Sequence, residues 1–202
     1  MKTRLFAMAA SSALVVLLVG CGAPHASSPT SAVSPATALP AVRSVANVSD
    51  SDVSFAQQMI PHHQQAVEMA DLALTRETSP EVKKLAEQIK AAQGPEIEMM
   101  SMWLQSWGAP MEMGEDHSGH DMGGMDMSGM MSDDDMQALA DAQGAEFDRM
   151  WLEMMIAHHQ GAISMAEQVK AASSNADVTS LAGAVMTGQA EEIDTMQKLL
   201  AQ

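Results

Sequence analysis

The sequence predicts an all-α fold, a four-helix bundle made of two duplicated helical hairpins with a Met/His-rich loop between them. Apolar residues recur at spacings of three and four along the long segments of the chain, which is the period of an amphipathic helix. Residues 55–104 also match residues 151–200 without a gap at 16 of 50 positions, which indicates a duplication. Two hairpins that each expose a broad apolar face bury those faces against one another as a bundle.

Residues 1–20 are predicted to be a lipoprotein signal peptide. A short basic start precedes an uncharged apolar run from Leu5 to Val19, which is shorter than the ~20 residues of a membrane-spanning helix and typical of an export signal. The run leads to Cys21, the only cysteine in the chain, in a Leu-Val-Gly-Cys sequence that resembles the bacterial lipobox. We expect Cys21 to be lipidated. The protein would then be exported and lipid-anchored, to the outer face of the cell membrane or in the periplasm. A simple signal peptide with a chance cysteine is the alternative.

Residues 21–50 are rich in Ala, Ser and Pro and lack apolar periodicity, so they are expected to form a flexible, lipid-anchored linker. Because Cys21 is the only cysteine, the mature protein would have no free thiol and no disulfide. Thiolate metal sites are thereby excluded, and a soft metal would have to bind methionine and histidine.

The folded domain is expected over 51–202, with a first repeat at about 51–108 and a Met-rich loop at 109–132. The first helix should start at the caps offered by Asp50-Ser51-Asp52. Ser79 and Pro80 mark the start of a second helix that ends before Gly108. Gly94-Pro95 should interrupt and bend that second helix.

The second repeat is expected at about 133–202. Ser132 and the three aspartates after it should cap a third helix at roughly 134–172, and Asn175 should start a fourth. The formal net charge of −16 argues against nucleic acid as a partner and favours a cationic ligand. Solubility alone is the simpler explanation of much of this charge.

The main candidate for chemistry is a duplicated His-His motif. Met-Ile-Pro-His-His-Gln-Gln-Ala-Val-Glu-Met-Ala at 59–70 returns as Met-Ile-Ala-His-His-Gln-Gly-Ala-Ile-Ser-Met-Ala at 155–166. Imidazole and thioether ligands together suit a soft late transition metal, above all copper. Helical spacing places the methionines and first histidine of each copy on one face, and a further methionine recurs on each partner helix. The candidate ligands in the bundle are Met59, His62, His63, Met69, Met100, Met155, His158, His159, Met165 and Met196.

A structural role for these residues is the alternative. Methionines at helical spacing are more often core residues than ligands. Four buried imidazoles are harder to explain in this way, because each costs free energy to bury unless it finds a partner. Glu96 and Glu192 recur at matching positions and could complete a site from the facing helix, while Gln93 and Gln189 could hydrogen-bond a buried imidazole.

The loop makes an independent argument for a soft metal. Seven methionines and two histidines lie within 111–131 on a glycine-rich backbone. Cu(I) and Ag(I) accept soft ligands without strict geometry, so such a segment can wrap them. The candidate ligands of the loop are His117, His120, Met122, Met125 and Met127. A linker kept soluble by its aspartates is the alternative.

The duplicated His-His-Gln-x-Ala-x-x-Met-Ala motif behind an export signal resembles the DUF305 family, over residues ~50–202. The resemblance implies a ferritin-like four-helix bundle that binds Cu(I), and also silver, outside the cytoplasm in metal resistance, buffering or trafficking. It points to Met59, His62, His63 and Met69 and to their counterparts in the second copy. The copper exporter or chaperone that would exchange metal with the protein is not identified by the sequence.

Two other classes of function are alternatives. An enzyme is not expected, because a di-iron centre needs Glu-x-x-His pairs, whereas a methionine stands three residues before the first histidine of each copy. A cupredoxin-type oxidase would need a cysteine ligand. The remaining alternative is a structural or partner-binding surface lipoprotein whose methionines form an adaptable recognition surface.

Overall fold

The computed structural model describes residues 47–112 and 129–202, which belong to one compact unit, Val42–Gln202. The predicted signal peptide, the predicted lipidation site Cys21 and the candidate ligands of the loop lie outside the described residues. The described helices are α1 (Asp50–Leu74), α2 (Pro80–Trp107), α3 (Asp133–Asp141), α4 (Gly144–Ala172) and α5 (Ala176–Leu200). No strand occurs in this part of the chain, so the prediction of an all-α fold is confirmed.

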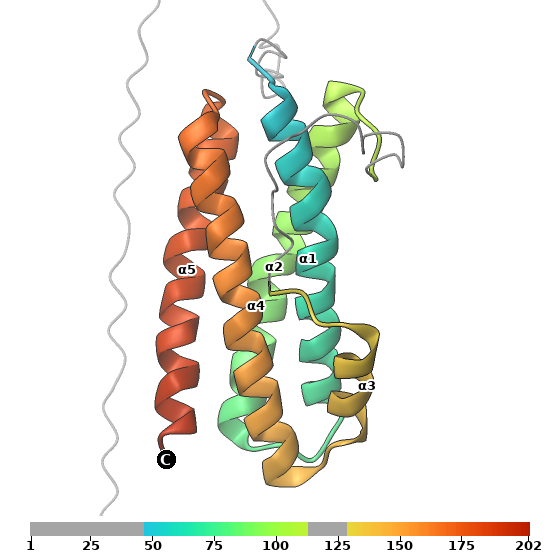
Figure 1. Cartoon of the computed structure of the whole chain (residues 1–202), viewed down its shortest axis with the longest axis vertical. Helices are drawn as coiled ribbons and strands as arrows, with labels where there is room; N and C mark the ends of the chain where they lie inside the picture. Colours follow the sequence, from blue (N-terminus) through green and yellow to red (C-terminus); the bar gives the residue numbers. More distant parts are fainter. Residues whose placement is uncertain (1–46, 113–128) are drawn as a thin grey trace, which may run out of the picture. The chain divides into compact units, whose positions relative to one another are not determined.

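The helices pair as the duplication predicts. α1 packs along α2 and α4 packs along α5, and the two hairpins meet mainly through α1 and α4 (Figure 1). α1 and α4 run antiparallel: the Trp151 indole near the start of α4 donates a hydrogen bond of 2.8 Å to the Met69 carbonyl near the end of α1. The core divides into two apolar clusters, one toward each end of this α1–α4 contact.

The helix starts follow the capping signals. The hydroxyls of Ser79 and Ser132 accept from the backbone at the third position of α2 and α3, and Asn175 caps α5. The cap of α1 is Ser49, one residue before the predicted aspartate and serine cluster, and Asp52 completes a capping box with it. A capping box pairs two backbone N–H groups at once, which is why the helix begins there.

The prediction of one continuous helix over 134–172 is wrong. α3 ends at Asp141 and α4 begins at Gly144, with Ala142 and Gln143 extended between them. Gly144 has φ +56°, a left-handed value that glycine adopts far more readily than other residues. Buried Leu139 of α3 packs into the same cluster as Trp151 of α4, so the break lets α3 cover one end of the bundle. The four-helix prediction therefore becomes five helices in the part of the chain that the structure describes.

The predicted interruption at Gly94-Pro95 is also wrong, because α2 continues through Pro95 without a break. α1 likewise continues through Pro61. A proline inside a helix removes one backbone hydrogen bond and crowds the preceding residue. Gly94 has no Cβ, which relieves that crowding in α2.

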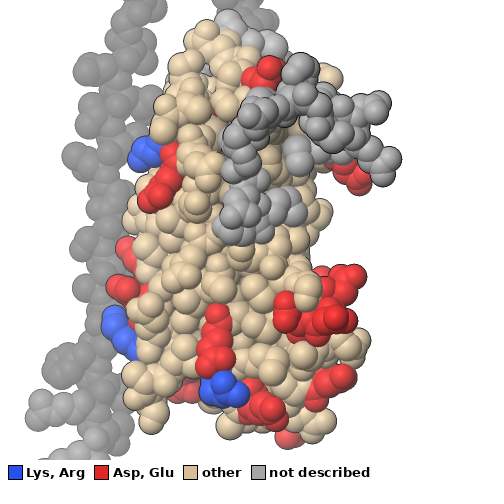
Figure 2. Space-filling model, viewed as in Figure 1, with Lys and Arg blue, Asp and Glu red and all other residues tan. Residues whose placement is uncertain are grey.

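The described surface is strongly acidic. Figure 2 shows acidic side chains gathered over the end of the bundle that carries α3, whose first turn contains Asp133, Asp134 and Asp135. Among the described helices, none is both long and apolar enough to cross a membrane.

Candidate metal centre

The four histidines of the two motif copies lie on α1 and α4, and His62 of one copy meets His158 of the other where these helices pack together. All four side chains are completely buried. The rings of His62 and His158 lie 3.8 Å apart between centroids and are tilted by 42°, and the rings of His158 and His159 lie 6.4 Å apart. The two copies of the motif therefore meet at His62 and His158.

Burial keeps the His158 ring free of an extra proton. Desolvation, followed by the neighbouring His62, His159 and His63, lowers the pKa of His158 to about 2. The ring is consequently neutral at physiological pH. No hydrogen bond within the described residues reaches either ring nitrogen of His158. The backbone of His62 acts in the opposite direction to burial and raises the pKa, as the last and smallest of the causes. A neutral imidazole with an available lone pair is the form that binds metals.

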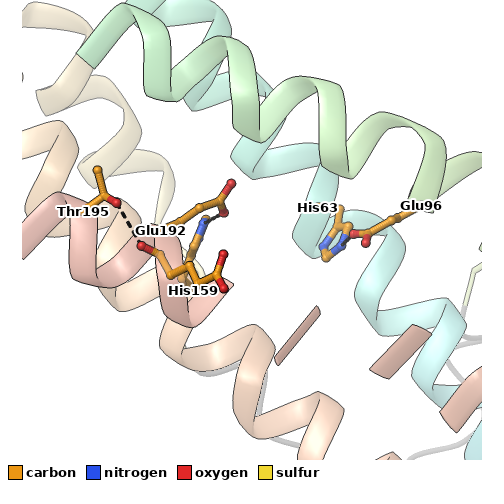
Figure 3. A network of polar contacts seen from close by, with 6 residues as sticks. His63, Glu96, His159, Glu192 and Thr195 are labelled. Atoms are coloured by element: carbon orange, nitrogen blue, oxygen red, sulfur yellow. Dashed lines mark hydrogen bonds and ion pairs between the residues drawn. The ribbon is translucent and has the colours of Figure 1, made fainter. Parts of the chain in front are cut away.

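The second histidine of each pair contacts a carboxylate of its own hairpin. His63 Nε2 lies 2.8 Å from Glu96 Oε2, and His159 Nε2 lies 2.7 Å from Glu192 Oε2. Figure 3 shows the two pairs in corresponding positions, one between α1 and α2 and the other between α4 and α5. The second ring nitrogen, Nδ1, of both histidines is buried and makes no hydrogen bond within the described residues.

The six candidate methionines of the bundle are all buried, and they divide between the two core clusters. One cluster contains Met59, Met100 and Met165, and the other contains their repeat counterparts Met155, Met196 and Met69. Each cluster thus takes two methionines from one repeat and one from the other. The predicted shared face of Met59, His62 and Met69 is buried as expected, but its two methionines belong to opposite clusters.

Gln93 and Gln189 are buried at 2% and 4% exposure, but the predicted hydrogen bond from Gln93 to an imidazole is absent. Neither amide atom of Gln93 has a partner within the described residues, and the amide oxygen of Gln189 has none there either. Gln93 therefore adds polar atoms, rather than a hydrogen bond to histidine, to the interior of the bundle.

The residues present fit a soft cation. Neutral imidazoles and thioethers are the ligands that Cu(I) prefers, whereas hard cations require oxygen ligands. The described residues contain no group of three or more His, Cys, Asp or Glu side chains arranged to hold a metal ion. A site in the bundle would therefore combine the histidines with buried methionines.

Two glutamines that sequence reasoning missed hold the ends of the Met-rich loop on α1. The Gln57 amide donates to the Pro110 carbonyl at 2.8 Å. The Gln65 amide donates to the Met131 carbonyl at 2.9 Å and accepts from the Met131 N–H at 2.7 Å. The available signal was a difference between the copies, since Gln65 corresponds to Gly161 in the second repeat.

Gly129 lies against Gly161, the residue at which the copies differ. It has φ +88°, and a Cβ there would lie 2.4 Å from the Ala157 carbonyl oxygen and 3.2 Å from the Gly161 Cα. Glycine at 129 is thus needed for the loop end to approach α4 this closely. The loop end at 129–131 is fixed against α1 and α4, beside the histidine motifs.

Comparison with known proteins agrees with this fold. Residues 52–200 match the family described as "Domain of unknown function (DUF305)". A DUF305 protein of Streptomyces coelicolor that is presumed to be secreted is 34% identical, with a TM-score of 0.67, and the match covers 75% of this chain and 91% of that one. A DUF305 fragment from Deinococcus radiodurans is 30% identical, with a TM-score of 0.66 and coverage of 77% and 98%. Among curated proteins, none matches significantly.

The structure is also similar to that of CopM. CopM in its Cu(II)-bound form is 37% identical, with a TM-score of 0.61, and the match covers 74% of this chain and 95% of CopM. CopM structures with Cu(I), with silver and in the apo form match at similar levels. These relatives are described as metal-bound or simply as DUF305 proteins, and none of them is described as an enzyme.

Proposed function

This chain belongs to the DUF305 family, and we propose that it is a lipid-anchored protein outside the cytoplasm that binds Cu(I), and also Ag(I), in metal resistance, buffering or trafficking. One observation carries the proposal: four buried imidazoles from two motif copies gather between two clusters of buried methionines. The similarity to CopM, whose structures contain copper or silver, supports it.

The proposed ligands of the bundle come from both repeats. His158 is neutral and its partner ring His62 lies against it, so a cation between the two copies would meet a lone pair without displacing a proton. The buried thioethers add soft donors. The proposed set is Met59, His62, His63, Met69, Met100, Met155, His158, His159, Met165 and Met196.

The loop and the N-terminus supply the rest of the proposal on sequence grounds. His117, His120, Met122, Met125 and Met127 would capture metal from solution, because thioethers, unlike thiols, do not form disulfides in an oxidising exterior. Lipidated Cys21 would hold the domain at the membrane. The acidic surface would raise the local concentration of cations.

The test is a titration with Cu(I) against a competing chelator, using protein that starts after Cys21. We expect at least one sub-micromolar site in the wild type. Met59→Leu with Met155→Leu should weaken the bundle site by about tenfold or more. Leucine conserves the volume of methionine and usually costs less than about 1.5 kcal/mol of stability, so the loss would report a missing sulfur ligand.

Met99→Leu is the matched control, because Met99 is 39% exposed on α2 and is not a proposed ligand. Its affinity should equal that of the wild type. A wild type without a sub-micromolar site would contradict the proposed function. Unchanged affinity in the double leucine variant would instead remove these two methionines from the ligand set.

One observation favours a second candidate, a partner-binding surface. The large exposed apolar side chains of the described residues are all methionines: Met99, Met102 and Met111. Met102 and Met111 line one shallow apolar hollow, and flexible thioethers suit adaptable recognition. This alternative predicts that neither Cu(I) nor Ag(I) raises the melting temperature, whereas a metal that binds only the folded state must raise it.

A further inference from the structure

The carboxylates of Glu96 and Glu192 stand in the same relation to the two outer histidines. Each Oε2 lies within hydrogen-bond distance of the Nε2 of a histidine 33 residues earlier in the chain, at 2.8 Å in the first hairpin and 2.7 Å in the second. The imidazoles are fully buried, while the carboxylates keep 20% and 19% exposure. The pairing recurs at the same sequence separation in both hairpins, and Figure 3 shows one pair in each.

The hydrogen bonds determine which ring nitrogen carries the proton. An ionised carboxylate can only accept, so the nitrogen that faces it, Nε2, must carry the hydrogen. A neutral imidazole has one N–H, and Nδ1 then keeps its lone pair. Protonation of Nδ1 as well would bury an N–H donor that has no acceptor within the described residues, which costs free energy.

We infer that Glu96 and Glu192 are positioning residues, which hold His63 and His159 as the Nε2–H tautomer and so leave Nδ1 as the atom that binds metal. The tautomer assignment stands on the contacts between these side chains, and its consequence for ligation rests on the proposed function. The carboxylates also place negative charge beside a buried site, which favours a cation over an empty centre.

A purely structural role is the competing explanation. The His63–Glu96 and His159–Glu192 bonds link α1 to α2 and α4 to α5, so they could serve only to join each hairpin. If the bonds were only structural links, their removal would lower the stability of the fold. It would leave the tautomer of each histidine and the metal affinity of the folded protein unchanged. A readout at the ring nitrogens separates the two roles.

The experiment is nitrogen-15 NMR of the histidine rings at pH 7.5 in metal-free protein, followed by titration of the same samples with Ag(I) and Cu(I). We expect His63 and His159 of the wild type to be single Nε2–H tautomers. In Glu96→Ala and Glu192→Ala the corresponding ring should lose that single tautomer. Affinity for either ion should fall by about 10–100-fold, as is usual when a partner of a ligating histidine is removed.

Two further variant pairs complete the design. Glu96→Gln and Glu192→Gln retain an acceptor oxygen, so they should restore the tautomer and part of the affinity. Glu98→Ala and Glu191→Ala remove exposed carboxylates from the same helices, so they should change neither. Circular dichroism would show that every variant keeps its helices.

The inference is overturned if either histidine is the Nδ1–H tautomer in the wild type, or if folded alanine variants keep both the tautomer and the affinity. Its failure is distinct from failure of the proposed function. A wild type with the expected tautomers that binds neither ion would contradict metal binding and leave the positioning of the rings established.

Discussion

At the scale of single residues, His158 illustrates how burial prepares an imidazole for a metal. Transfer of the ring into the bundle disfavours its charged form, and three other histidines around it act in the same direction, so its pKa falls to about 2. Protons and metal ions compete for the same lone pair. The folded protein therefore removes the competing proton before any metal arrives.

The same burial makes the metal-free protein sensitive to acid. Below pH 6.5 the unfolded chain binds a proton at His158, whereas the folded chain does not until about pH 2. The unfolded state is then favoured as pH falls, and this one group lowers the free energy of unfolding by about 1.4 kcal/mol per pH unit. We expect urea unfolding between pH 6 and pH 4 to have a stability slope steeper by about that amount in the wild type than in His158→Gln.

Comparison of the two slopes is essential, because many carboxylates titrate over the same range and both proteins share them. Glutamine does not titrate, so the difference isolates His158. Equal slopes in the two proteins would mean that the His158 ring gains its proton in the folded state at ordinary pH, and the centre would no longer be proton-free.

The candidate site residues could be predicted from the sequence where the duplication repeated them. The periodicity of the His/Met stripes predicted buried faces, and the structure buries His62, His63, His158 and His159 completely. The contact between His62 and His158 was not predictable, because it depends on which helices of the two hairpins meet. Glu96 and Glu192 carried a signal in their matched spacing, but sequence alone does not specify a hydrogen bond.

At the scale of elements, helix starts were predictable and the break between α3 and α4 was not. Ser79, Ser132 and Asn175 act as caps because their side chains accept from local backbone N–H groups, an interaction determined by a few neighbouring residues. The break at Ala142 and Gln143 depends on distant contacts instead. Arg76 donates to the Ala142 carbonyl at 3.1 Å, and Asp148 of α4 accepts from the Ser79 N–H at 3.0 Å.

Two glycines test the importance of this break. Gly144 has φ +56° and Gly188 lies in the interior of α5, and an added Cβ would meet open space at both positions. Gly144→Ala should lower the free energy of unfolding by about 1 kcal/mol, because alanine is strained at a left-handed φ. Gly188→Ala should raise it by about 0.5–1 kcal/mol, because glycine weakens a helix interior.

Urea unfolding followed by circular dichroism measures both changes. The comparison is informative because the two substitutions add the same methyl group without a clash. Opposite changes in the free energy of unfolding would therefore come from the backbone conformation alone. A stabilising Gly144→Ala would imply that α3 and α4 can join into the single helix expected from the sequence.

At the scale of the whole molecule, the duplication produces an approximate two-fold arrangement centred on the histidines. His62 and His158 are equivalent positions of the two repeats and contact each other, as residues do at a two-fold axis. The two methionine clusters are related in the same way, since Met59 lies in one and its counterpart Met155 lies in the other. The symmetry is incomplete, because the Trp151 indole bonds to the Met69 carbonyl while Phe55, its counterpart, has no such donor.

This arrangement predicts one shared metal centre in the bundle instead of one site per repeat. The five proposed loop ligands would first be replaced by serine, which removes the proposed loop site. Two independent sites would lose half their Ag(I) stoichiometry when His158 and His159 become glutamine, and the first repeat would keep its affinity. A shared centre would lose high-affinity binding altogether, because the ring that faces His62 is gone.

Equilibrium titration with mass spectrometry of the intact complex distinguishes these outcomes, and the reciprocal variant with His62→Gln and His63→Gln provides the control. We expect both variants to lose high-affinity Ag(I) binding to the same extent, since each removes half of one centre. Retention of one tightly bound ion in either variant would contradict a shared centre. The residual asymmetry, Pro61 against Ala157 and Phe55 against Trp151, would then decide which repeat keeps its metal.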